Sequence, residues 1–172
     1  MKHIRLVRYL AYTIELMIFF MIQQTPGLVP SVFGVLPTVL VPAACAVALF
    51  ESPSCALLFG VFSGFLLDYG TGSTFGLHAL ILGVSCFIVS FLVQDLFQRN
   101  FLTGMIMILA VTVLVTLLQW LFLYALRGYD SAFYVLLRYY ATGTAYTLCT
   151  APLFYYLNRG FSYLLHRTRQ KP

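Results

Sequence analysis

Six long apolar stretches follow one another along this chain, separated by short segments rich in polar residues, glycine or proline. A membrane-spanning helix needs about 20 predominantly apolar residues, and each stretch approaches or exceeds that length. We predict spanning helices at about residues 8–24, 32–50, 54–68, 75–93, 101–126 and 131–158. The pattern indicates an all-α fold, a polytopic membrane helix bundle with six transmembrane helices, built as a single integral membrane domain over residues 1–172.

The second stretch contains Pro37 and Pro42, and Pro30 lies just before it. Proline lacks a backbone N–H group, and in lipid the resulting gap must be covered by other parts of the protein. We therefore expect a loop-like entry followed by a short helix. The fifth and sixth stretches are longer than a bilayer is thick, so we expect these two helices to tilt or to protrude.

The composition agrees with this pattern. The chain is 61% hydrophobic and only 9% charged, whereas a soluble domain carries about 25% charged residues. A chain of 172 residues cannot bury so many apolar side chains in its own core, because small domains expose much of their surface. Lipid must be the solvent. The four cysteines lie in apolar stretches without CxxC spacing, and we interpret them as packing residues.

The basic residues predict the orientation. Six spans place both termini on one side of the membrane. That side carries eight of the ten Lys and Arg residues, namely Lys2, Arg5, Arg8, Arg99, Arg159, Arg167, Arg169 and Lys171. The positive-inside rule then predicts that both termini are cytoplasmic. Topology and anionic membrane lipids account for the net charge of +5, so we expect no nucleic-acid partner.

A glycine-spaced run joins the third and fourth stretches, with residues of interest at every fourth position: Gly60, Gly64, Asp68, Gly72 and Gly76. Gly60 and Gly64 form a GxxxG face, which lets helix backbones approach closely in lipid. This face is a candidate contact for a partner helix or for packing within the bundle. Because each glycine in a helix costs about 1 kcal/mol, we expect the third helix to end near Asp68 and residues 69–74 to form a tight outer turn.

Asp68 would place a carboxylate at a helix C-terminus, where negative charge opposes the helix dipole. We expect compensation from backbone N–H groups of the turn and of the fourth helix, with Ser73 and Thr74 as caps. A cation is the other source. Arg138 lies at matched depth in the sixth helix, and His78 lies one turn into the fourth. Asp68 would then brace the turn, contact a partner protein, or handle a substrate or proton.

Two further carboxylates lie toward the cytoplasmic side. Glu15 lies about two turns into the first helix. We expect it to make a hydrogen bond between helices or subunits, in protonated form, unless Arg5 or Arg8 reaches toward it. Glu51 lies in the turn after the second helix, and we expect it to be solvated.

The remaining residues show no catalytic pattern. The chain has only three histidines, and it contains no HExxH, GxSxG or phosphate-binding loop. No set of acid, base and nucleophile converges, and a metal site would have too few ligands. We therefore expect no enzymatic activity, no cofactor and no metal.

The run from Gly60 to Leu80, GVFSGFLLDYGTGSTFGLHAL, resembles the family of the rod-shape-determining protein MreD. The matching features are the glycine-spaced helix, the aspartate, the Gly-Ser turn and the Gly-Leu-His-Ala segment. Over the rest of the chain the resemblance lies in hydropathy and helix count. The turn ESPS at residues 51–54 departs from the family, whose members often carry basic residues there.

This resemblance implies a scaffold of the bacterial cell elongation machinery, the elongasome, in the inner membrane. Proteins of this family bind the membrane helix of MreC and help regulate cell shape and peptidoglycan synthesis. Through MreC they connect indirectly to MreB and to the SEDS glycosyltransferase–transpeptidase pair. Their helical arrangement is similar to that of the substrate-binding subunits of energy-coupling-factor vitamin transporters. The alternative is therefore a small-molecule or vitamin-binding transporter subunit, with Asp68, His78 and Arg138 in an outer cavity.

Overall fold

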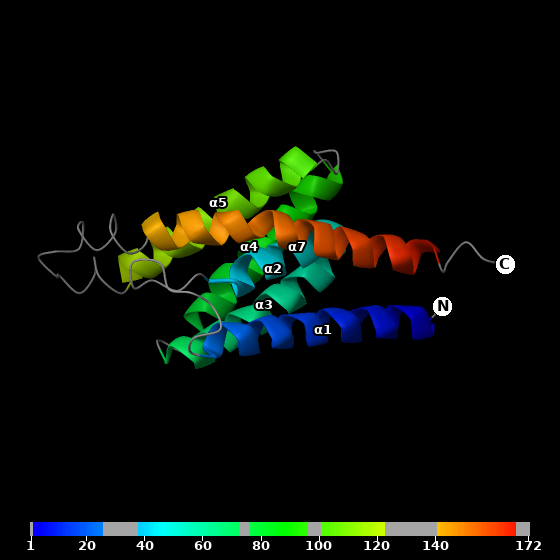
Figure 1. Cartoon of the computed structure of the whole chain (residues 1–172), viewed down its shortest axis with the longest axis horizontal. Coiled ribbons are helices and arrows are strands. Elements are labelled where there is room, and N and C mark those ends of the chain that lie inside the picture. Colours follow the sequence, from blue (N-terminus) through cyan, green and yellow to red (C-terminus); the bar gives the residue numbers. More distant parts are fainter. Residues whose placement is uncertain (1, 26–37, 73–75, 96–100, 123–140, 168–172) are drawn as a thin grey trace, which may run out of the picture.

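The computed structural model describes residues 2–25, 38–72, 76–95, 101–122 and 141–167. The regular structure of these residues is helical (Figure 1). The helices are α1 (Lys2–Gln24), α2 (Leu40–Phe50), α3 (Pro53–Thr71), α4 (Leu77–Asp95), α5 (Phe101–Trp120) and α7 (Ala141–Arg167). The start of α1 and the end of α7 lie at the same end of the bundle (Figure 1).

The short helix α2 is the centre of the bundle. Its ten residues from Leu40 to Leu49 are all buried, and it packs against α1, α3, α4, α5 and α7. A helix that is apolar on every side is stable only when it is surrounded. Its 11 residues extend about 16 Å, roughly half the hydrocarbon thickness. The predicted short second helix is therefore confirmed, whereas its predicted entry at 32–37 lies outside the described residues.

The buried start of α2 obtains hydrogen-bond partners from other helices. The Leu40 N–H donates to Gln23 Oε1 of α1 at 3.2 Å, and the Thr38 N–H donates to Thr147 Oγ1 of α7 at 3.2 Å. Pro42 in the first turn has no N–H to satisfy. These contacts allow a helix to begin inside the bundle, away from water.

The closest packing joins α3 to α4. A Cβ added to Gly64 would lie 2.3 Å from Ala79 Cα, and one added to Gly60 would lie 2.8 Å from the Leu82 carbonyl oxygen. Only glycine lets the two backbones approach this closely. Of the two roles considered for the GxxxG face, the structure shows packing within the bundle.

The third helix is longer than we predicted. It continues through Thr71, so Tyr69 to Thr71 are helical and do not form a turn. Its C-cap is Gly72, which has the left-handed conformation with φ of 59°, and the Gly72 N–H donates to the Asp68 carbonyl oxygen at 3.1 Å. Such a glycine ends a helix without steric cost. The predicted end at Asp68 was therefore one turn too early.

The outward faces of the helices are apolar. Three described helices are long and apolar enough to cross a membrane: Pro53–Thr71, Leu77–Gln94 and Phe101–Trp120. Large apolar side chains stand exposed along them, including Leu80 and Phe91 on α4 and Leu102, Ile106 and Leu117 on α5. Soluble monomers rarely expose apolar surface of this extent, so the fold is that expected of a membrane helical bundle.

Candidate functional site

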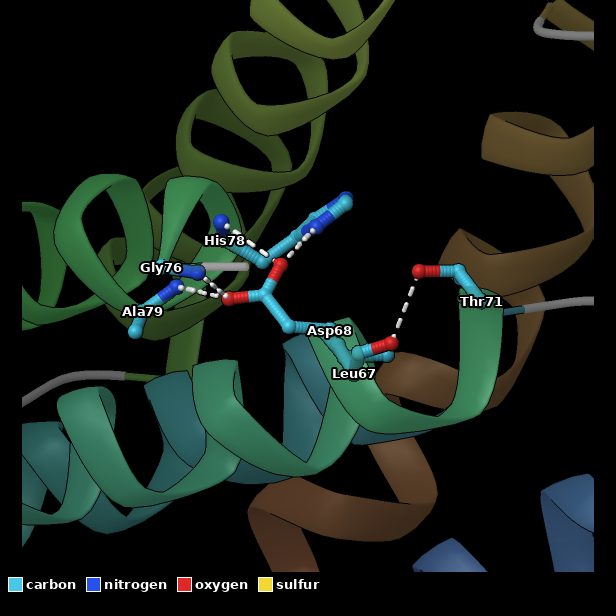
Figure 2. A network of polar contacts seen from close by, with 6 residues as sticks. All are labelled: Leu67, Asp68, Thr71, Gly76, His78 and Ala79. Carbon is cyan, nitrogen blue, oxygen red and sulfur yellow. Dashed lines mark hydrogen bonds and ion pairs between the residues drawn. The ribbon is translucent and has the colours of Figure 1, made fainter. Parts of the chain in front are cut away.

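The carboxylate of Asp68 is the centre of a buried polar network between α3 and α4. Its Oδ2 accepts hydrogen bonds from the Gly76 N–H at 2.8 Å and the Ala79 N–H at 3.3 Å. Its Oδ1 accepts from the His78 N–H at 3.1 Å and lies 2.7 Å from His78 Nδ1. Figure 2 shows the Asp68 side chain projecting from α3 toward the first turn of α4. Asp68 is fully buried, with an exposed fraction of 0%.

The local sequence explains why α4 needs this carboxylate. The first N–H groups of a helix have no partner within it, and a side chain just before the helix normally accepts their hydrogen bonds. That position is held by Gly76, which has no side chain and has a φ of 93°. Asp68 therefore caps α4 from the neighbouring helix. Ser73 and Thr74, the predicted caps, lie outside the described residues.

His78 completes the network. Its ring lies beside the carboxylate with Nδ1 2.7 Å from Oδ1, which places the second ring nitrogen on the far side (Figure 2). Because an ionised carboxylate can only accept, Nδ1 is the donor when Asp68 is ionised. The side chains of His78 and Asp68 are 4% and 0% exposed. The expected local compensation of Asp68 is therefore present. The expected Asp68–Arg138 pair cannot be described, because Arg138 lies outside the described residues.

The network is suited to holding the helices together. A carboxylate has about four lone-pair positions, and four donors already occupy those of Asp68. Little acceptor capacity is left for a ligand. The geometry therefore favours the bracing role for Asp68 among the three roles considered above.

A second polar cluster lies at the opposite end of α3, where α2 ends. Arg8 Nε lies 2.8 Å from Glu51 Oε1, and Arg8 Nη2 donates to Glu51 Oε2 at 2.9 Å. The Glu51 carbonyl oxygen accepts from Ser90 Oγ at 2.6 Å and from Gln94 Nε2 at 2.7 Å. Glu51 is only 3% exposed. The prediction that it is solvated was wrong, because α1 and α4 close over the short turn.

Glu15 forms a third contact, between α1 and α7. Its Oε1 accepts a hydrogen bond from Asn158 Nδ2 at 3.0 Å, and the two residues are 7% and 0% exposed. The expected hydrogen bond between helices is present. Arg8, one of the cations considered for Glu15, is engaged by Glu51 instead. Sequence reasoning missed Asn158 because the only partners considered by name were the cations Arg5 and Arg8, although Asn158 is an amide within the last apolar stretch.

The candidate site residues thus fall into separate structural groups. Gly60 and Gly64 face α4, Asp68, Gly76 and His78 form one network, and Glu15 lies in another. No group of three His, Cys, Asp or Glu side chains that could hold a metal ion occurs in the described part of the chain. Comparisons with protein-family models, curated proteins and solved structures return no match.

Proposed function

We propose that this chain is a non-enzymatic membrane scaffold of the MreD type, acting in the bacterial cell elongation machinery. It would bind the membrane helix of MreC and so help regulate cell shape and peptidoglycan synthesis. The observation that carries the proposal is the run from Gly60 to Leu80. Its distinctive residues are used to build a hairpin: the glycines allow close packing, and Asp68 caps α4. A scaffold requires such rigidity, and no catalysis is needed.

The proposal includes six spans with both termini in the cytoplasm. Two features support it. Eight of the ten basic residues would lie on the cytoplasmic side, and the start of α1 and the end of α7 lie at the same end of the bundle (Figure 1). An even number of membrane crossings places the start of the first helix and the end of the last helix on the same side. The arrangement would resemble that of transporter substrate-binding subunits.

The surface that would receive MreC is one of the outward apolar faces. Gly60 and Gly64 are covered by α4, so replacing them would damage the bundle before it tested a partner. Exposed positions are better probes. Ile14 on α1, Leu80 on α4 and Ile106 on α5 each point away from the core.

A photo-crosslinking residue at each of these three positions, with the buried Leu82 as a matched control, tests the proposal in bacterial cells. Crosslinks to MreC from one face, and none from Leu82, would support the scaffold and identify its surface. Purification of the tagged chain in mild detergent, with mass spectrometry, is the companion experiment. Recovery of an ATPase module without MreC, together with melting that depends on a small molecule, would overturn the scaffold in favour of a transporter subunit.

A further inference from the structure

The three buried carboxylates in the described part of the chain differ sharply in how they are compensated. Asp68 accepts four hydrogen bonds, and Glu51 meets the guanidinium of Arg8. Glu15 accepts one hydrogen bond, from the neutral amide of Asn158. A buried carboxylate anion with a single neutral donor would be very costly in a medium without water.

Two orphaned atoms show what is missing. Glu15 Oε2 and Asn158 Oδ1 are both buried, both are acceptors, and neither has a hydrogen-bond partner among the described residues. They belong to two groups that are already joined by the 3.0 Å bond from Asn158 Nδ2 to Glu15 Oε1. The second amide hydrogen is directed to the Phe154 carbonyl oxygen at 3.3 Å, which fixes which end of the amide is nitrogen.

We propose that Glu15 is a proton-binding site: Oε2 carries a proton and donates it to Asn158 Oδ1, so that the acid and the amide form a closed pair of hydrogen bonds. A protonated carboxyl group is both donor and acceptor, as is an amide. One proton therefore satisfies both orphaned acceptors and removes the buried charge. This inference goes beyond the scaffold proposal, which assigns no ligand to Glu15.

Among the side chains that the structure describes, those around Glu15 offer no cation in its place. On α1, Arg8 is engaged by Glu51, and Tyr12 is a fully buried phenol. On the helices packed against α1, the ionisable side chains described are Cys45 of α2, and Cys55, Asp68 and Tyr69 of α3, none of which is a cation. On α7, Arg159 follows Asn158 in sequence but is exposed.

The proton would join α1 to α7. These helices also meet where the rings of Phe19 and Phe154 lie 4.7 Å apart, edge to face. Loss of the proton would leave an anion at Glu15 with an acceptor oxygen of Asn158 beside it. In this proposal the polar contact between the first and last described helices depends on a proton and not on a salt bridge.

Infrared spectroscopy of the purified full chain in lipid bilayers tests this directly. We expect a C=O stretching band of a hydrogen-bonded carboxylic acid at neutral pH, moving to lower frequency in heavy water. The band should disappear in Glu15→Gln and persist in Glu51→Gln. If Glu15 gave a carboxylate band and no carboxylic acid band, the proposal would be overturned. Stabilisation by Na⁺ or K⁺ that is lost in Glu15→Gln would also overturn it.

The variants Glu15→Gln and Glu51→Gln also form a matched pair for thermal melting. Glutamine can replace a neutral acid, because its amide donates to Asn158 Oδ1 and accepts from Nδ2. Glu15→Gln should therefore shift the Tm by less than about 2 °C, whereas Glu51→Gln, which leaves Arg8 without its anion, should lower it by about 5 °C or more. A Glu15→Gln variant that melts as early as Glu51→Gln, or fails to fold, would contradict the proton site.

Discussion

Asp68→Asn is the most informative single substitution in the hairpin of α3 and α4. Asparagine has nearly the size of aspartate, but its NH₂ group replaces one carboxylate oxygen. Each oxygen of Asp68 faces two donors: Oδ1 faces the N–H and Nδ1 of His78, and Oδ2 faces the N–H groups of Gly76 and Ala79. If the NH₂ group faces Gly76 and Ala79, both N–H groups lose their acceptor. If it faces His78, the His78 N–H loses its acceptor, and Nδ1 must change tautomer to accept from the NH₂ group.

The expected loss follows from these contacts. A hydrogen bond to a charged group contributes about 1.5–3 kcal/mol, so losing one or two costs about 1.5–6 kcal/mol. The bonds that remain also weaken, because their acceptor becomes neutral. For a chain of this size, 1 kcal/mol shifts the Tm by about 2–4 °C. We therefore expect Asp68→Asn to lower the Tm by roughly 3–24 °C.

Thermal melting in one mild detergent, followed by circular dichroism, measures this shift. Ser85→Ala is a matched control, because Ser85 is also buried on α4 but its hydroxyl bonds only to Ile81 of its own helix, at 2.7 Å. We expect that control to lose about 1 kcal/mol or less. His78→Ala removes one of the four donors, the ring Nδ1, and keeps the backbone N–H. It leaves no donor without an acceptor, so its loss should be smaller than that of Asp68→Asn. If Asp68→Asn had the same Tm as Ser85→Ala, capping by Asp68 would not stabilise the hairpin.

Two other predictions use the same assay. Gly64→Ala should lower the stability by about 1–3 kcal/mol or more, because its Cβ would lie 2.3 Å from Ala79 Cα. The control Gly160→Ala, where a Cβ would meet nothing within 4 Å, should raise the stability by about 0.5–1 kcal/mol. Equal effects of the two substitutions would refute the close-packing argument. Arg8→Lys should lower the stability by about 1 kcal/mol, because an ammonium cannot reproduce the two-point contact with Glu51. The loss is kept this small because the Arg8 side chain is a quarter exposed and water screens the pair. A Tm equal to that of the natural chain would contradict this prediction.

The helix boundaries show where local reasoning succeeds. The short second helix could be predicted from its prolines, and Leu40–Phe50 is that helix. The end of α3 was predicted one turn too early, because the cost of glycine in a helix was taken to end it near Asp68, yet Gly70 lies within the helix. Gly72, and not Gly70, has the left-handed conformation that ends it. Propensity alone gives no reason to choose between two such glycines.

The polar contacts show where reasoning from the local sequence fails. Glu51 was expected in water because it lies in a turn, yet α1 supplies Arg8 and α4 supplies Ser90 and Gln94 to enclose it. Asn158 lies 143 positions from Glu15. Pairings at such separations depend on how helices cross, and no local pattern encodes a crossing.

The sequence by itself determined that this chain is apolar beyond what a soluble domain can bury, and that its few internal carboxylates must be compensated, because an uncompensated charge is too costly away from water. Only the tertiary structure decided how: backbone N–H groups for Asp68, a guanidinium for Glu51 and an amide for Glu15. The reason is geometric. The need for a partner is a property of one residue, but the choice of partner depends on which side chains the packed helices bring within 3 Å or so of it.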